Sequence, residues 1–161
     1  MKHFFIVLVY LCFLSCNRDI PTTFSEQALN ETFISMEGGE INFEAILDSY
    51  NNKTIFIDVW ASWCGDCIKA LPKVATLQKE YPEVVFLFLS IDKSENNWKK
   101  GIDRHNIDGE HYYMPSGWNG AFGDFIDLDW TPRYIILDQN KNIKLFEAIK
   151  ADDKRIKEKL Q

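Results

Sequence analysis

Two long apolar runs, separated by a segment with helical periodicity, constrain the fold of this chain most strongly. The first run, residues 54–60, is apolar on both faces apart from Asp58, and the second, residues 84–91, is almost continuously apolar. A strand with two apolar faces is normally covered on both sides of a sheet. Residues 64–81 repeat apolar positions every three or four residues, and Pro82 ends them. This order predicts a right-handed βαβ unit with parallel strands.

The segments around this unit extend it into a single α/β domain, because 161 residues are enough for one packed domain and few for two. The net charge of -6, without a long basic run, argues against binding of nucleic acid. The other predicted elements are a hairpin over residues 32–42, an amphipathic helix over 92–105, a short strand over 110–114, a short helix over 121–126, an antiparallel hairpin over 133–147 and a helix over 152–160.

Residues 1–16 have the composition of an export signal. A positively charged start precedes an apolar run over residues 4–14, which is too short to span a bilayer. The run ends in Ser15-Cys16, so the segment resembles a bacterial lipoprotein signal, in which cleavage leaves a lipid-modified cysteine at position 16. Phe13 stands where that signal usually has Leu, and ordinary signal cleavage is the alternative.

The domain boundaries follow from this pattern. Residues 17–30 are polar and predict a flexible tether, which leaves residues 31–161 as the folded domain. We therefore expect a monomeric, exported lipoprotein that faces the periplasm and is attached to the inner or outer membrane through Cys16. With Cys12 in the signal and Cys16 acylated, only Cys64 and Cys67 remain in the domain.

Cys64 and Cys67 form a C-x-x-C motif at the predicted junction of strand and helix. Cys64 would lie at the helix N-terminus, where backbone N–H groups and the helix dipole favour a thiolate, and Cys67 would lie one turn further in. Cys64 is therefore the expected nucleophile and Cys67 the cysteine that resolves the mixed disulfide. Asp58, on the buried strand beside them, is the expected proton acceptor; a structural carboxylate held by backbone donors is the alternative.

The segments FIDVWASWCGDC and WTPRYIILD, with Pro72 inside the intervening helix, resemble the thioredoxin superfamily, and most of all its exported TlpA/ResA-type branch. The resemblance covers roughly residues 34–160. It implies a thioredoxin-like fold, with a central mixed β-sheet flanked by helices, an N-terminal hairpin and an insertion before the strand that follows a cis-proline. It also implies no cofactor and no metal beyond the redox-active Cys64–Cys67 disulfide.

The resemblance assigns further site residues. Trp60 and Trp63 match the tryptophans that support the active site, and Asp58 matches the buried acid. Pro132 matches the cis-proline opposite the disulfide, with Thr131 presenting its backbone to an extended substrate.

Two departures from the family pattern affect the expected role. Gly65-Asp66 replaces the usual Gly-Pro or Glu-Pro between the cysteines, and a carboxylate at Asp66 disfavours a thiolate at Cys64. Ala70 stands where the cytochrome-maturation members carry a glutamate, which weakens a haem-related role.

The residues before Thr131 leave two interpretations open. Asp124, Asp127 and Asp129 form either a solvated acidic loop or a surface that repels acidic partners. Trp118, Phe122 and Trp130 either line a docking surface or belong to the core.

The expected activity is reduction of disulfides in exported proteins, with electrons from a membrane thiol donor. An oxidase or isomerase using the same cysteines is the nearest alternative. A metal module of Cys64 and Cys67 with His105 and His111 is a weaker one, because two surface histidines at this spacing rarely complete a zinc site. A thiol peroxidase is disfavoured, since Ala61 stands where that family has threonine.

Overall fold

The computed structural model describes residues 20–161. The predicted signal, Cys16 and the first part of the expected tether lie outside the described residues. Among residues 20–161, no helix combines the length and the apolarity needed to cross a bilayer.

A seven-stranded mixed sheet forms the centre of the molecule, in the order β2-β1-β5-β4-β3-β6-β7. The strands are β1 Thr32–Ser35, β2 Glu40–Asn42, β3 Ile55–Trp60, β4 Val85–Ser90, β5 Glu110–Tyr113, β6 Arg133–Leu137 and β7 Ile143–Ala148. β3, β4 and β5 run parallel, whereas β6 runs antiparallel to β3 and β7 to β6. The predicted βαβ unit and both predicted hairpins are therefore confirmed.

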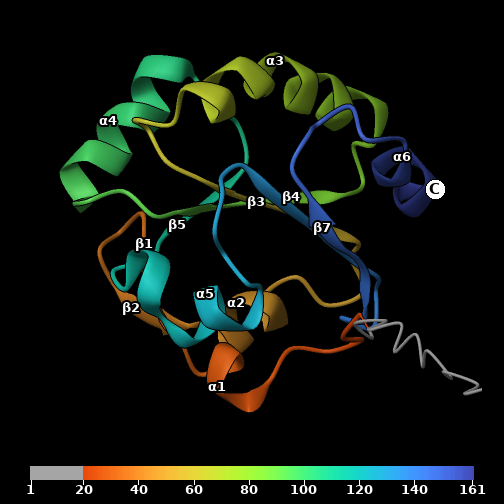
Figure 1. Cartoon of the computed structure of the whole chain (residues 1–161), viewed down its shortest axis with the longest axis horizontal. Helices are drawn as coiled ribbons and strands as arrows, with labels where there is room; N and C mark the ends of the chain where they lie inside the picture. Colours follow the sequence, from red (N-terminus) through yellow and green to blue (C-terminus); the bar gives the residue numbers. More distant parts are fainter. Residues whose placement is uncertain (1–19) are drawn as a thin grey trace, which may run out of the picture.

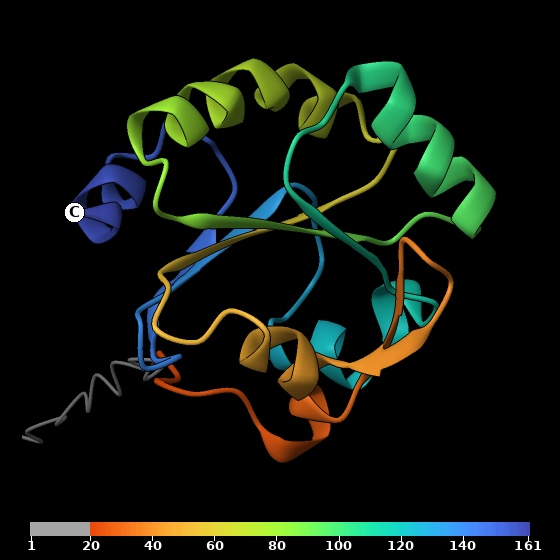
Figure 2. The same cartoon turned by 180° about the vertical axis from the view of Figure 1, so that it is seen from behind.

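Helices cover both faces of this sheet. They are α1 Glu26–Leu29, α2 Phe43–Asp48, α3 Gly65–Glu80, α4 Glu95–His105, α5 Ala121–Phe125 and α6 Lys154–Leu160, with a 3₁₀ turn η1 at Gly117–Asn119. α3 and α4 lie on one side of the sheet, and α1, α2 and α5 lie on the other (Figures 1 and 2). β3 is buried along its whole length between these layers, as its two apolar faces require.

Helix α3 packs on the sheet through a buried stripe that includes Cys67, Val74 and Leu77. Ala75, the apolar residue next to Val74 in this helix, is exposed. Pro72 lies inside the helix, where the resemblance places it.

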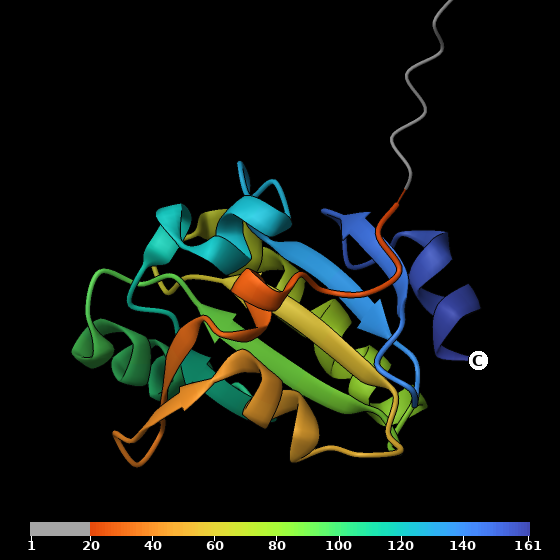
Figure 3. The same cartoon turned by 90° about the horizontal axis from the view of Figure 1, so that it is seen from below.

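The folded body begins before the expected boundary at residue 31. Phe24 is buried, and its ring lies 4.9 Å from that of Phe43 and 5.7 Å from that of Phe122. Ala28 in α1 is fully buried beside them, and Figure 3 shows α1 lying against the face of the sheet that carries α2 and α5. The predicted tether of residues 17–30 is thus too long, because apolar side chains anchor its second half to the domain.

Candidate active site

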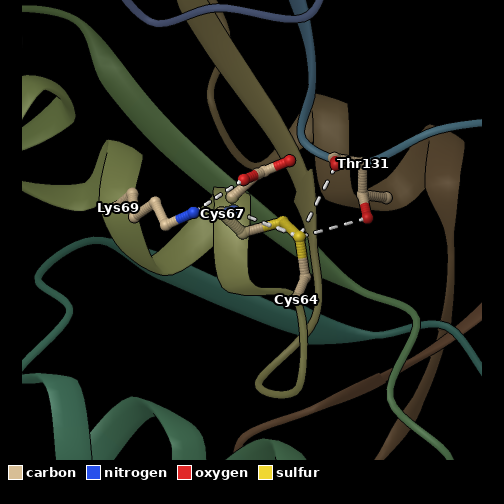
Figure 4. Close-up of polar contacts among 5 residues, drawn as sticks. Cys64, Cys67, Lys69 and Thr131 are labelled. Atoms are coloured by element: carbon tan, nitrogen blue, oxygen red, sulfur yellow. Dashed lines mark hydrogen bonds and ion pairs between the residues drawn. A yellow bond between two sulfur atoms is a disulfide. The ribbon is translucent and has the colours of Figure 1, made fainter.

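Cys64 and Cys67 are joined by a disulfide at the start of α3, with 5.3 Å between their Cα atoms (Figure 4). Cys64 is the N-cap residue of α3, and its sulfur accepts a hydrogen bond of 3.1 Å from the backbone N–H of Cys67. An N-terminal amide aimed at the sulfur favours negative charge on it once the disulfide is opened. Cys64 is 7% exposed and Cys67 only 2%, so the sulfur at the helix end is the more accessible one.

The backbone before β6 lies directly opposite Cys64. The Thr131–Pro132 peptide bond is cis, as the resemblance implies. The Cys64 sulfur lies 3.5 Å from both the carbonyl oxygen and the hydroxyl of Thr131, and both residues of the cis pair are buried (Figure 4). The structure therefore brings together two segments that are far apart in the sequence.

Asp58 is a carboxyl group in the core. It is 3% exposed on β3, and its Oδ1 atom has no hydrogen-bond partner among the described residues. Burial raises the pKa of Asp58 to about 8, so the group holds a proton near neutral pH and can exchange it there. This arrangement does not fit the alternative of a carboxylate held by backbone donors.

Tyr134 is the partner of Asp58 on the neighbouring strand. The two residues face each other in the register of β3 and β6, and the hydroxyl of Tyr134 is likewise buried without a partner among the described residues. Burial, together with the Asp58 charge, raises the pKa of Tyr134. The apolar environment of this pair thus disfavours ionisation of either side chain.

Asp92, which the sequence analysis did not select, holds the loop before Cys64. Its carboxylate accepts hydrogen bonds from the Ser62 backbone N–H at 3.0 Å, the Ser62 hydroxyl at 2.6 Å and the Ser90 hydroxyl at 2.8 Å. Because Asp92 is 3% exposed, these charge-assisted bonds are shielded from water and fix the loop to the end of β4. The only sequence signal is a carboxylate placed directly after an apolar strand.

The tryptophans at the site divide into two kinds. Trp60 is fully buried, with its ring against the helix glycine Gly101, and so supports the site from within. Trp63, Trp118 and Trp130 are exposed and line a groove of about 370 Å³ at Cys64. Trp118 and Trp130 therefore belong to the surface.

The residues between the cysteines lie open to solvent. Gly65 faces open space, since a Cβ atom added there would meet nothing within 4 Å. Asp66 is exposed and pairs with Lys69 at 3.3 Å.

Phe122, which the sequence left open as a docking residue, is fully buried in the core.

Arg133, which the sequence analysis also missed, is a buried residue that holds the loop of Ile126 to Asp129 in place. Its guanidinium donates to the carbonyl oxygens of Ile126 at 2.7 Å and Asp127 at 3.3 Å, and to the carboxylate of Asp129 at 2.8 Å. The Arg133 side chain is 6% exposed, whereas that of Asp129 is 85% exposed. The buried arginine thus determines where the loop before the cis-proline runs.

The two histidines of the metal alternative differ in exposure. His105 is half-buried, and His111 is buried with its ring 5.1 Å from that of Phe88 and its Nε2 2.9 Å from the Ile107 carbonyl. Within residues 20–161, no three His, Cys, Asp or Glu side chains gather as a metal site would require. The described residues therefore do not assemble the Cys/His cluster that this alternative requires.

Comparisons with known proteins agree with the fold and the motif. A family model described as "Thioredoxin-like" matches residues 51–143. A candidate thiol-disulfide oxidoreductase from Bacteroides vulgatus superimposes with a TM-score of 0.68 at 26% identity, covering 91% of each chain. A candidate thiol:disulfide interchange protein DsbE from Chlorobium tepidum gives 0.69 at 16% identity, covering 89% of this chain and 100% of the other, and shows the fold alone.

Among curated relatives, thioredoxin of Geodia cydonium is 35% identical over 54 residues, which are 34% of this chain and 51% of that protein. The chain thus spans about half the length of the curated relatives it matches. The predicted superfamily is confirmed: the chain belongs to the thioredoxin-like family.

Proposed function

We propose that this protein is a thiol-disulfide oxidoreductase that reduces disulfides of exported proteins. The observation that carries the proposal is the Cys64–Cys67 disulfide at a helix N-terminus, which faces a cis-proline and follows a strand that buries an acid. The similarity to thiol-disulfide oxidoreductases of known structure supports it.

The first step is attack by the Cys64 thiolate on a substrate disulfide. A bond forms between Cys64 and one substrate sulfur, the substrate S–S bond breaks, and the other substrate sulfur leaves as a thiolate. The amide of Cys67 stabilises the attacking thiolate, and the exposed groove admits the substrate.

The second step closes the enzyme disulfide. Cys67 loses its proton, attacks Cys64 and expels the second substrate thiolate, so the substrate gains two electrons and the enzyme loses two. Asp58 in its ionised form accepts the proton of Cys67, and its raised pKa makes it a strong enough base for a thiol.

The cycle requires a thiol donor that restores the two cysteines. We assign this role to a membrane thiol carrier, and we place the domain at the periplasmic side of a membrane, anchored through Cys16. The export pattern of residues 1–16 supports this placement. Acyl labelling of the whole chain, and its loss in Cys16→Ala, tests the anchor.

The direction of transfer is tested by the reduction potential of the Cys64–Cys67 couple, measured against a glutathione buffer. A reductase requires a potential near that of thioredoxin, about -270 mV, whereas a value near about -120 mV would make the protein an oxidant. Reduction of insulin by the dithiol form is the matching activity assay. If the protein refolds a substrate with scrambled disulfides faster than it reduces that substrate, it is instead an isomerase.

A further inference from the structure

We propose that the groove at Cys64 selects substrate cysteines that are flanked by both a basic and an apolar side chain. This inference rests on the proposed function and names its substrate class. The partner is an extended protein segment that carries lysine or arginine within one or two residues of the cysteine under attack.

The residues that line the groove determine which substrate side chains can be contacted near Cys64. Cys64 is one of its lining residues; Trp63 comes from the loop before α3, Trp118 comes from η1, and Trp130 precedes the cis-proline. The ring centroids of Trp63 and Trp118 are 6.5 Å apart, so they form one wall. A substrate segment that reaches Cys64 through the groove therefore has tryptophan side chains within its reach.

The exposed tryptophans favour apolar and cationic neighbours of the cysteine. Trp63 is 52% exposed and Trp130 54%, which is unusual for rings of this size in a small domain. An apolar substrate residue gains by covering these rings. A lysine or arginine gains as well, because the face of an indole attracts a cation.

The charges in the groove lead to the same preference. Asp66 and Asp129 are its charged lining residues, and among residues 20–161 no lysine, arginine or histidine contributes to that lining. A cation near two carboxylates and an indole is therefore attracted, and an acidic residue is repelled.

The ion pairs of the two carboxylates do not cancel this effect. Lys69, the partner of Asp66, has a side chain that is 81% exposed, so a substrate cation can replace it at small cost. Arg133, the partner of Asp129, is buried and also serves two backbone carbonyls, while the carboxylate itself is 85% exposed. Both carboxylates thus remain accessible from the groove.

The test uses disulfide-linked dimers of short peptides that share one sequence, with leucine before the cysteine and lysine, alanine or glutamate after it. The rate constant of each with the reduced protein is divided by its rate constant with dithiothreitol, which removes the intrinsic reactivity of the disulfide. We expect the lysine peptide to be at least about tenfold faster than the glutamate peptide at low salt, which corresponds to about 1.4 kcal/mol.

The double variant Asp66→Asn, Asp129→Asn should bring this ratio close to one. Asp124→Asn is the matched control, because it removes an exposed carboxylate from nearby α5, outside the groove, and it should keep the ratio. Replacing the leucine of the lysine peptide by serine should lower the rate of the wild-type protein by a larger factor than the rate of the Trp130→Ala variant. Raising salt from about 50 to about 500 mM should shrink the wild-type ratio, a result that does not depend on any variant folding.

A wild-type ratio near one, or a ratio that the double variant leaves unchanged, would overturn the inference. If insulin is still reduced in that case, the proposed function stands and only the selectivity is refuted. If neither insulin nor any peptide is reduced, the proposed function itself fails.

Discussion

Replacing Asp58 by asparagine should change how the stability of the oxidised protein depends on pH. The buried carboxyl holds its proton in the fold up to about pH 8, whereas in the unfolded chain it ionises near pH 3.9. The folded state therefore binds the proton more tightly. The stability from this difference is fully present below about pH 4 and is lost as the pH rises through about 8.

The size of the effect follows from the displacement of the pKa. Between about pH 5 and 7 the unfolded chain has lost the proton and the folded protein has not, so wild type loses about 1.4 kcal/mol of unfolding free energy per pH unit from this group. Asparagine has no proton to lose. The free energy of unfolding of the variant minus that of wild type should thus rise by about 3 kcal/mol over these two units.

Guanidinium unfolding without reductant, at about pH 5, 6 and 7, measures this difference directly. Asp103→Asn is the control, because it makes the same chemical change at an exposed position of α4. A difference between Asp58→Asn and wild type that stays constant across these pH values would refute the assignment of a raised pKa. The same variant should release the mixed disulfide more slowly in stopped-flow measurements, and an unchanged rate would remove Asp58 from the proton transfer.

Three further predictions concern the support of the site. Gly101→Ala should lower the free energy of unfolding by about 1–3 kcal/mol, because the new methyl group would lie 2.4 Å from the Ser62 side chain; Gly65→Ala, which meets nothing within 4 Å, should not. Asp92→Asn should weaken the hydrogen bonds that hold Ser62 in the loop before Cys64. We expect the reduced protein to react more slowly with iodoacetamide, with only a small decrease in its melting temperature. Arg133→Met should cost about 2–3 kcal/mol in denaturant unfolding by leaving the buried carbonyl of Ile126 without its donor, and an unchanged midpoint would contradict that role.

The sequence predicts the centre of this fold well, because the strands there are long apolar runs. β3, β4 and α3 fall within a residue or two of their predicted bounds. α1 was not predicted, since four residues with two polar side chains show no helical pattern; the Ser25 N-cap starts the helix, and burial of Ala28 and Phe24 against other elements holds it. Local periodicity cannot reveal such a tertiary contact.

The site was predictable where chemistry is tied to a motif. Cys64 and Cys67 lie as expected, and the buried position of Asp58 follows from its apolar neighbours. The contacts of Asp92 and Arg133 were not predictable, because a carboxylate after a strand or an arginine after a proline is common on protein surfaces. Only the tertiary structure shows that both side chains are buried and hold loops beside the disulfide.

The aromatic contact between Phe24, Phe43 and Phe122 has a practical consequence for work on the isolated domain. A shortened chain that starts at residue 31 would omit Phe24 and expose the two rings beneath it to water. Because Phe122 belongs to α5, this loss would also destabilise the segment that leads to the groove at Cys64. Expression of the isolated domain should therefore start upstream of Phe24, at residue 20 or earlier.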